Sequence, residues 1–309
     1  MTEITPWHWI GFILCILFFL ALDLGVFHRR ARVVKFKEAL AWSALWFSLA
    51  MLFAGLMAYW RSHAEAVEFV TGYVIEYSLS LDNIFVIAVI FSYFQVAPEA
   101  RHKLLFWGVL GALIMRGAMI LAGVGLIQRF GWILYLLGAF LVFTGSKMFF
   151  SSGKPEDSEN NIAIRFTKKF FPKFLANQSG KAAVPFIFVL FLIEFTDLIF
   201  ALDSIPAIFA VTTKPFVVFT SNVFAILGLR SLYFVLAEAI DYFRYLKTGL
   251  AAVLIFVGVK MLLSPHGREP QWFQVEISTL ISLLVIAGIF LTCIILSVIV
   301  ARHEKKLNR

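Results

Sequence analysis

Cysteine is scarce in this chain, and the motifs that mark zinc-binding and nucleotide-binding proteins are missing. The only two cysteines, Cys15 and Cys293, lie inside apolar runs. A disulfide or a soft-metal thiolate site is therefore not expected, and both residues are interpreted as inert, buried thiols. The sequence has no zinc-finger spacing, no P-loop and no glycine-rich dinucleotide turn, so no motif supports these classes.

Charge is also scarce, because only 15% of the residues are Asp, Glu, Lys or Arg. Hydrophobic residues make up 61% of the 309, and the mean hydropathy is +0.88. A soluble protein of this length could not bury so much apolar surface, so the composition predicts an all-α polytopic membrane protein in contact with lipid. The net charge of +8 does not indicate a nucleic-acid partner, because the bases cluster at the ends of apolar runs.

Nine apolar runs are long enough to cross a bilayer as helices, which takes about 17–25 residues. They are 7–27, 39–60, 69–95, 104–127, 131–150, 184–211, 216–239, 246–263 and 276–300. Residues 1–309 are predicted to form one membrane domain, whose parts are two N-terminal helices (7–60), a first repeat (66–150), a cytoplasmic loop (151–183), a second repeat (184–263) and a C-terminal helix (276–300). No Lys or Arg precedes the first run, so we expect a retained helix rather than a cleaved signal peptide.

The basic residues alternate from loop to loop, and this alternation predicts the orientation of the chain. The loops assigned to the inside, together with the C-terminal tail, carry nineteen Lys and Arg residues. The loops assigned to the outside carry only Arg61, Arg129, Lys214 and Arg268. Because short loops rich in Lys and Arg stay inside, the N-terminus is expected outside and the C-terminus inside.

Two three-helix segments carry matching sequence elements in the same order. The alignment pairs Glu76 with Asp197, Asp82-Asn83 with Asp203-Ser204, Arg116 with Arg230, and Phe143–Met148 with Phe256–Met261. By the loop charges, the first segment enters the membrane from outside and the second from inside. Inverted repeats of this kind are typical of secondary transporters, whose site lies at the midplane between the copies.

Polar residues inside the apolar helices are the candidate site. An acid near the bilayer centre costs roughly 2.5–3.5 kcal/mol and usually marks an ion or proton path. The candidate metal ligands are Asp23, Glu76, Asp82, Asn83, Glu194, Asp197, Asp203 and Ser204. Asp203 follows Asp197 by six residues, a rotation of about 240° on a regular helix. We expect Pro206 to kink this helix and so bring Asp203 toward the other acids.

Some of these residues admit a second interpretation. Arg116 and Arg230 are candidates for charge compensation, and they could equally neutralise two acids as structural ion pairs. Asp23 lies five residues before His28, near the inner end of the first helix, and could be only interfacial.

The ligand types limit the ion. All candidate ligands are oxygens, and the six histidines lie at helix ends or in loops. Hard oxygen ligands suit Mn²⁺, Ca²⁺ or Mg²⁺ and argue against Cu⁺ or Zn²⁺, although they do not rank the first three. Clustered carboxylates must take up protons when a divalent metal leaves, so metal–proton exchange is expected. No tightly bound cofactor is predicted.

Several segments carry a resemblance to a known family. They are Ala21–Phe27, Glu76–Val86, Glu194–Asp197, Phe200–Val211 and Ser221–Arg230, within a similarity that covers roughly residues 8–300. On these segments the chain resembles the TerC family, and within it the bacterial Alx branch. The resemblance implies export of Mn²⁺ across a bacterial inner membrane and assigns the six acids to the functional site. Tyr77 is a departure, because relatives often have Lys there, and this difference bears on ion preference.

Two functions of other classes stay open. Paired aspartates could serve an intramembrane aspartyl hydrolase, but the presenilin-type Gly-x-Gly-Asp signature is absent, and we expect no enzyme activity. A membrane scaffold in stress response would act through loop 151–183 instead of the acids. In that loop, residues 162–175 mix Ile and Phe with Lys, which is typical of a helix on the inner leaflet or of a solvated linker. The sequence alone does not identify any protein partner.

Overall fold

A computed structural model describes residues 4–22, 36–151, 186–239, 245–265 and 274–307. Asp23 and residues 152–183, with the short helix expected at 162–175, lie outside the described residues. Every element within the described ranges is a helix, and these ranges contain no strand. The predicted all-α architecture is therefore confirmed for this part of the chain.

The described ranges hold nine helices, one for each expected apolar run. They are α1 (Pro6–Leu22), α2 (Phe36–Trp60), α3 (His63–Tyr93), α4 (Pro98–Arg129), α5 (Ile133–Ser151), α8 (Phe186–Phe209), α9 (Pro215–Ala239), α10 (Leu246–Leu263) and α11 (Thr279–Leu307). Seven of them are long and apolar enough to cross a membrane. The other two are α1, which is apolar but shorter, and α8, which has sufficient length but carries three acids.

Local capping chemistry sets where the helices begin. α3 begins at His63, six residues before the expected run, because the Ser62 side chain accepts a hydrogen bond from the Glu65 N–H at 3.1 Å. α4 begins at Pro98, where the missing N–H costs nothing because the first turn of a helix has no partner for it. The early start of α3 places two further acids, Glu65 and Glu68, inside the helix.

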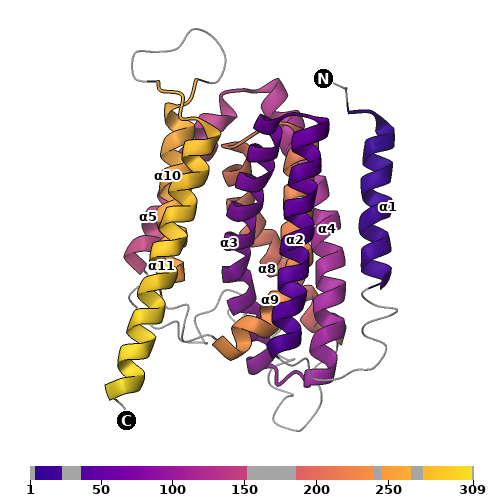
Figure 1. The fold of residues 1–309 in the computed structure, drawn as a ribbon, viewed down its shortest axis with the longest axis vertical. Coiled ribbons are helices and arrows are strands. Elements are labelled where there is room, and N and C mark those ends of the chain that lie inside the picture. Colours follow the sequence, from indigo (N-terminus) through magenta and orange to yellow (C-terminus); the bar gives the residue numbers. More distant parts are fainter. Residues whose placement is uncertain (1–3, 23–35, 152–185, 240–244, 266–273, 308–309) are drawn as a thin grey trace.

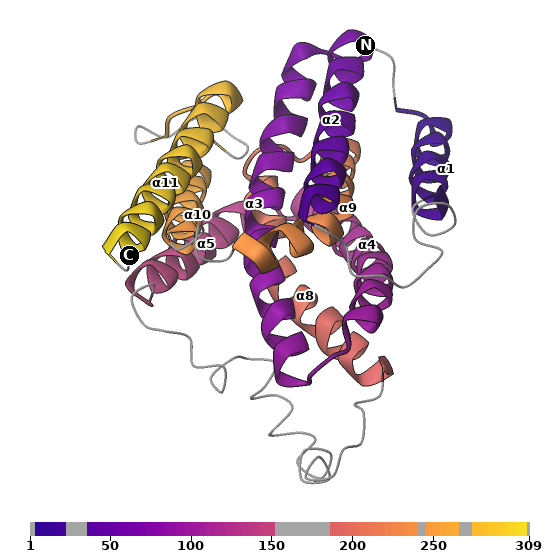
Figure 2. The same cartoon turned by 60° about the horizontal axis from the view of Figure 1, so that its bottom comes forward.

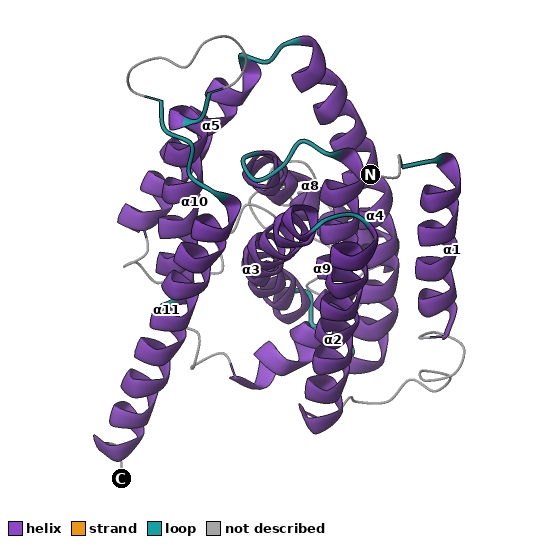
Figure 3. Ribbon diagram, turned by 45° about the horizontal axis from the view of Figure 1, so that its top comes forward, coloured by secondary structure: helices purple, strands orange, loops and turns teal. Residues whose placement is uncertain are grey.

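Two groups of helices build the bundle (Figure 1). In the larger group α3 packs on α2, α8 and α9, and α4 packs on α8 and α9. In the smaller group α5, α10 and α11 form a layer along one side, whereas α1 lies at the opposite side (Figure 2). Seen toward one end of the bundle, α3, α8 and α9 occupy the middle (Figure 3). The acid-bearing helices α3 and α8 pack against each other and against helices of both groups.

Glycines allow α5 and α10 to approach closely. A Cβ atom on Gly138 would lie 3.1 Å from the Gly258 carbonyl oxygen, and one on Gly145 would lie 2.9 Å from the Ala251 carbonyl oxygen. Gly145 and Gly258 are equivalent in the sequence alignment, and the same offset pairs Gly138 with Ala251. Exchanging the two copies therefore converts each of these contacts into the other.

The outer surface of the described bundle is largely apolar. Large apolar side chains such as Leu14, Leu52, Ile114 and Leu284 are more than half exposed on the outer helices. Buried polar side chains lie chiefly on α3, α8 and α9. An apolar exterior with polar groups confined to the interior is the distribution expected when lipid is the solvent.

Candidate cation site

Matching intervals on two helices bring four polar side chains together. On α3, Asn83 follows Glu76 by seven residues, and on α8, Ser204 follows Asp197 by the same interval. Seven residues are nearly two helical turns, so each pair lies on one face of its helix. Since α3 and α8 pack on each other, the two faces meet in the interior of the bundle.

Arg116 on α4 connects these side chains. Its guanidinium donates twice to Asp197, from Nη2 to Oδ1 at 2.8 Å and from Nε to Oδ2 at 3.1 Å. Its Nη1 forms an ion pair with Glu76 Oε1 and donates to Ser204 Oγ at 3.3 Å. The Arg116 side chain is only 1% exposed, and Glu76 is fully buried. One arginine thus pairs with an acid from each of the two predicted repeats.

Several buried oxygen atoms of the candidate ligands accept no hydrogen bond from the described residues. They are Glu76 Oε2, Asn83 Oδ1 and Glu194 Oε2. Asn83 Nδ2 donates to Asp197 Oδ1 at 3.1 Å, which leaves the amide oxygen for another partner. A buried acceptor without a hydrogen-bond partner costs about 1–3 kcal/mol. Several such acceptors therefore indicate a place for water or a cation.

Glu194 reaches the same region from α8. It lies three residues before Asp197, on the same side of the helix, and the two carboxylates interact electrostatically. The Glu194 carboxylate rests against Gly111 of α4, where a methyl group would overlap it. Glu194 can therefore occupy its observed position only because residue 111 is a glycine.

Asp82 and Asp203 form a separate group. Each follows the acid before it, Glu76 or Asp197, by six residues, which turns it about 240° around its helix. Asp82 and Asp203 interact electrostatically with each other, and Thr144 of α5 hydrogen-bonds to Asp203. α8 continues as one helix through Pro206 to Phe209, so the proline does not interrupt it.

The described acids therefore lie in two groups and not in a single cluster. Glu76 and Asp197 pair with Arg116, Glu194 lies next to Asp197 and Gly111, and the remaining pair lies toward α5. Within the described ranges, no three or more His, Cys, Asp or Glu side chains are placed to hold a metal ion together. A cation bound beside Arg116 would need neutral oxygens as well as carboxylates. The predicted ligand Asp23 is not among the described residues.

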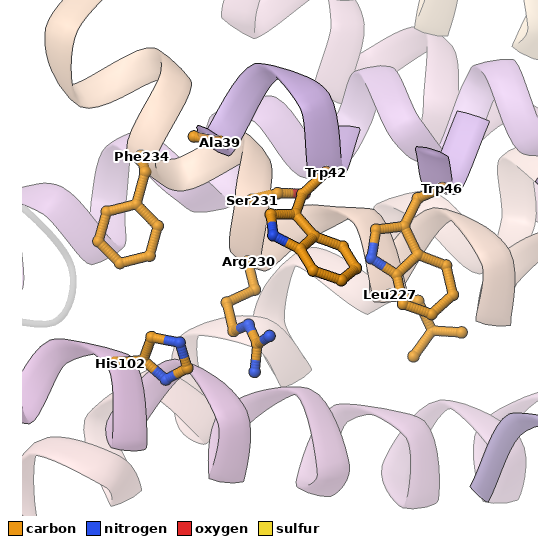
Figure 4. Close-up of a pocket in the computed structure, with 8 residues that line it drawn as sticks. All are labelled: Ala39, Trp42, Trp46, His102, Leu227, Arg230, Ser231 and Phe234. Carbon is orange, nitrogen blue, oxygen red and sulfur yellow. The ribbon is translucent and has the colours of Figure 1, made fainter. Parts of the chain in front are cut away.

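Arg230, the counterpart of Arg116 in the repeat, lies in different surroundings. It lines a pocket of about 20 Å³ between α2, α4 and α9, together with Trp42, Trp46 and His102 (Figure 4). This volume holds roughly one water molecule. None of the candidate metal ligands lines the pocket. The repeat therefore places two arginines at equivalent positions, and Arg116 is the one that bridges Glu76 and Asp197.

The structure also contains a polar cluster near the start of α3 that was not predicted from the sequence. Arg61 pairs with Glu65 at 2.8 Å, and Lys214, from the turn between α8 and α9, lies 3.4 Å from Glu65 and 3.1 Å from Glu68. Thr212 Oγ donates to Glu68 Oε2 at 2.8 Å. The four-residue spacing of Arg61 and Glu65 is the sequence signal for part of this cluster, because such pairs meet on a helix.

Apolar helices around a polar, charge-paired interior define a polytopic integral membrane protein. Residues 61–305 match the model of a family described as "Integral membrane protein TerC family". The chain belongs to the TerC family, as its sequence segments indicated.

Relatives of similar length support this assignment. The chain is 48% identical to "Uncharacterized membrane protein STKORF319" of Myxococcus xanthus, over 97% of this chain and 94% of that one. It is 42% identical to "Putative membrane-bound redox modulator Alx" of Escherichia coli K12, over 98% of both chains. It is 39% identical to an "Uncharacterized membrane protein" of Rickettsia bellii, over 93% of this chain and 97% of that one. No solved structure matches the chain.

Proposed function

We propose that this chain is a secondary transporter that exports a divalent cation, most readily Mn²⁺, from the cytoplasm in exchange for protons. The proposed location is a bacterial inner membrane, with the N-terminus outside and the C-terminus inside. The observation that carries the proposal is the Arg116 bridge, which joins Glu76 of α3 to Asp197 of α8 inside a bundle of apolar helices. Acids in such a position are typical of ion and proton paths.

Unpaired oxygen atoms of three candidate ligands supply the ligand chemistry. Glu76 Oε2, Asn83 Oδ1 and Glu194 Oε2 accept no hydrogen bond from the described residues. Mn²⁺, Ca²⁺ and Mg²⁺ prefer carboxylate, amide and hydroxyl oxygens. The proposed site therefore combines carboxylates with the Asn83 amide and the Ser204 hydroxyl, and does not use all the predicted ligands at once.

Arg116 gives the site a way to release its cargo. While a divalent cation is bound, Glu76 and Asp197 turn oxygens toward it. When the cation leaves, these carboxylates return to the guanidinium or take up protons, because unpaired charges in the interior are costly. Exchange among metal, arginine and proton thereby couples cation movement in one direction to proton movement in the other.

Alternating access is proposed to follow from the inverted repeat. The first triplet is α3, α4 and α5, and the second is α8, α9 and α10. The interchangeable glycine contacts between α5 and α10 support this division. Rocking of one triplet against the other would open the midplane site to each side in turn. Lys214, which connects the turn between α8 and α9 to Glu68 of α3, must change partners when that end opens.

Purified protein in liposomes tests the proposal. Mn²⁺, Ca²⁺ and Mg²⁺ are supplied one at a time under two opposite pH gradients. We expect Mn²⁺ movement driven by the proton gradient, and its loss in Glu76→Gln and Asp197→Asn. Lys147→Gln, at an exposed position of α5, is the matched charge-removing control and should transport normally. No gradient-driven movement of any of the three ions by the unmodified protein would contradict the proposal, whereas faster Ca²⁺ or Mg²⁺ movement would change only the cargo.

A hydrolase is the second candidate, and the proximity of Asp82 and Asp203 favours it. Two aspartates that interact across α3 and α8 have the composition of an acid–base dyad. Purified protein incubated with membrane-spanning peptides would cleave them, and Asp82→Asn would abolish the cleavage. Intact peptides after incubation with active transporter would remove this candidate.

A further inference from the structure

Asn222 of α9 is a buried polar residue outside the ligand set described above. Its side chain is 1% exposed, and neither its amide oxygen nor its amide nitrogen has a hydrogen-bond partner among the described residues. The neighbouring Thr220 and Ser221 hydroxyls instead donate to carbonyls of α9 itself. Burying an amide without a hydrogen bond costs free energy of folding. This side chain is therefore expected to bind a ligand.

Two contacts give the direction in which Asn222 points. Phe219 touches Gly117 of α4, and Ser221 touches Gly72 of α3. On a regular helix Asn222 lies about 60° around the axis from Phe219 and about 100° from Ser221. The two rotations have opposite signs, so Asn222 lies between Phe219 and Ser221 around the helix. Its side chain therefore points between α4 and α3. Both helices pack on α9.

The Arg116–Glu76 ion pair lies between those same two helices. Gly117, which Phe219 touches, is the residue after Arg116, and Gly72, which Ser221 touches, is one turn from Glu76. Asn222 therefore lies within about one helical turn of the ion pair, on the side of α9 that is turned toward α3 and α4. Glu76 Oε2 is buried and accepts no hydrogen bond from the described residues, as is true of the Asn222 oxygen.

We propose that the Asn222 side-chain oxygen is a neutral ligand of the transported divalent cation, supplied by α9 and acting together with Glu76. The inference rests on the transport function proposed above and adds a third helix to the site. An amide oxygen replaces one water of the hydrated ion without adding a charge that Arg116 would have to balance. The equivalent position of the first repeat is Gly108, so this ligand occurs once and makes the site asymmetric.

Binding of Mn²⁺ to the purified full-length protein tests the proposal without any need for transport. Titration followed by the electron spin resonance of free Mn²⁺ gives the affinity. Asn222→Leu, which has a similar shape without the oxygen, should weaken Mn²⁺ binding about tenfold or more. The same variant should unfold at an unchanged or higher temperature, because an unpaired buried amide is removed. Asn222→Asp restores an oxygen at the same place and should bind Mn²⁺ at least as tightly as the unmodified protein.

The controls separate this inference from the transport proposal. Thr220→Val removes a buried hydroxyl two residues away that bonds only its own helix, and it should leave Mn²⁺ affinity unchanged. Unchanged Mn²⁺ affinity in Asn222→Leu, or equal weakening in the Leu and Asp variants, would overturn the role of Asn222. If Glu76→Gln weakens binding in the same series, the transport proposal survives that result. If the unmodified protein binds no Mn²⁺, both fail together.

Discussion

The guanidinium of Arg116 meets the carboxylate of Asp197 edge to edge, through two hydrogen bonds of 2.8 and 3.1 Å. This geometry fixes the orientation of both groups, and it leaves Nη1 for Glu76. The arginine therefore sets the separation between the acids of α3 and α8. In the proposed cycle its positive charge also balances the carboxylates of Glu76 and Asp197 when no cation is bound.

Replacement of Arg116 tests whether the cation and the arginine substitute for each other as the positive charge beside the acids. Arg116→Gln removes one partner of a buried ion-pair network, so we expect a loss of about 3–5 kcal/mol in the free energy of unfolding. Mn²⁺ should recover more stability in this variant than in the unmodified protein, because the cation supplies the missing positive charge. Thermal unfolding in detergent, with Mn²⁺ or with a chelator, measures both effects.

Lys147→Gln serves as the control for loss of a positive charge, since Lys147 is exposed on α5. It should unfold as the unmodified protein does under both conditions. An identical Mn²⁺-induced shift in the unmodified protein and in Arg116→Gln would show that the cation and the arginine do not exchange.

The position of Glu194 gives a second prediction. In Gly111→Ala the new methyl group overlaps the Glu194 carboxylate, which must move away from α4. Mn²⁺ transport should fall, through a higher half-saturating concentration. Gly125→Ala on the same helix meets nothing within 4 Å and should transport normally while gaining up to about 1 kcal/mol of helix propensity. Equal transport by the two variants would remove Glu194 from the site.

Much of the bundle could be predicted from the sequence, because long apolar runs determine spanning helices almost alone. Each of the nine expected runs overlaps one helix in the described ranges. The helix starts were less predictable: α3 begins at His63 because Ser62 caps it, although Glu65 and Glu68 interrupt the apolar pattern there. Hydropathy measures transfer to lipid, whereas the start of a helix depends on hydrogen bonds to its first N–H groups.

The site was predictable only in part. The seven-residue intervals from Glu76 to Asn83 and from Asp197 to Ser204 place each pair on one face, which is a property of any regular helix. The choice between Arg116 and Arg230 was not predictable, because the repeat makes their sequence positions equivalent. Asn222 was missed for a related reason: one polar residue in an apolar run becomes informative only when its neighbours are known.

The Asp82–Asp203 pair gives a third prediction. The two side chains interact electrostatically on a face that the Arg116 group does not share. Asp82→Asn and Asp203→Asn should therefore be non-additive, with the double variant losing less Mn²⁺ transport than the product of the single losses. Asp82→Asn combined with Gly125→Ala provides the additive reference. Additive losses for the aspartate pair would mean that the two acids act separately.

The contact between α5 and α10 gives the last prediction. In Gly258→Ala the new Cβ would lie 2.7 Å from the Gly138 carbonyl oxygen, and in Gly145→Ala it would lie 2.9 Å from the Ala251 carbonyl oxygen. Backbone atoms cannot rotate away, so the helices must separate, and we expect each variant to lose about 1–3 kcal/mol of stability. The two losses should be similar, because the contacts exchange under the repeat. Thermal unfolding in detergent measures them.

Gly288→Ala on α11 is the matched control, since a Cβ there meets nothing within 4 Å. It should raise the unfolding temperature slightly, because alanine favours the helix more than glycine does. If Gly145→Ala and Gly258→Ala behave like this control, α5 and α10 do not pack as described. A large loss in one variant alone would mean that the contact is asymmetric, and the division into two equivalent triplets would lose its structural support.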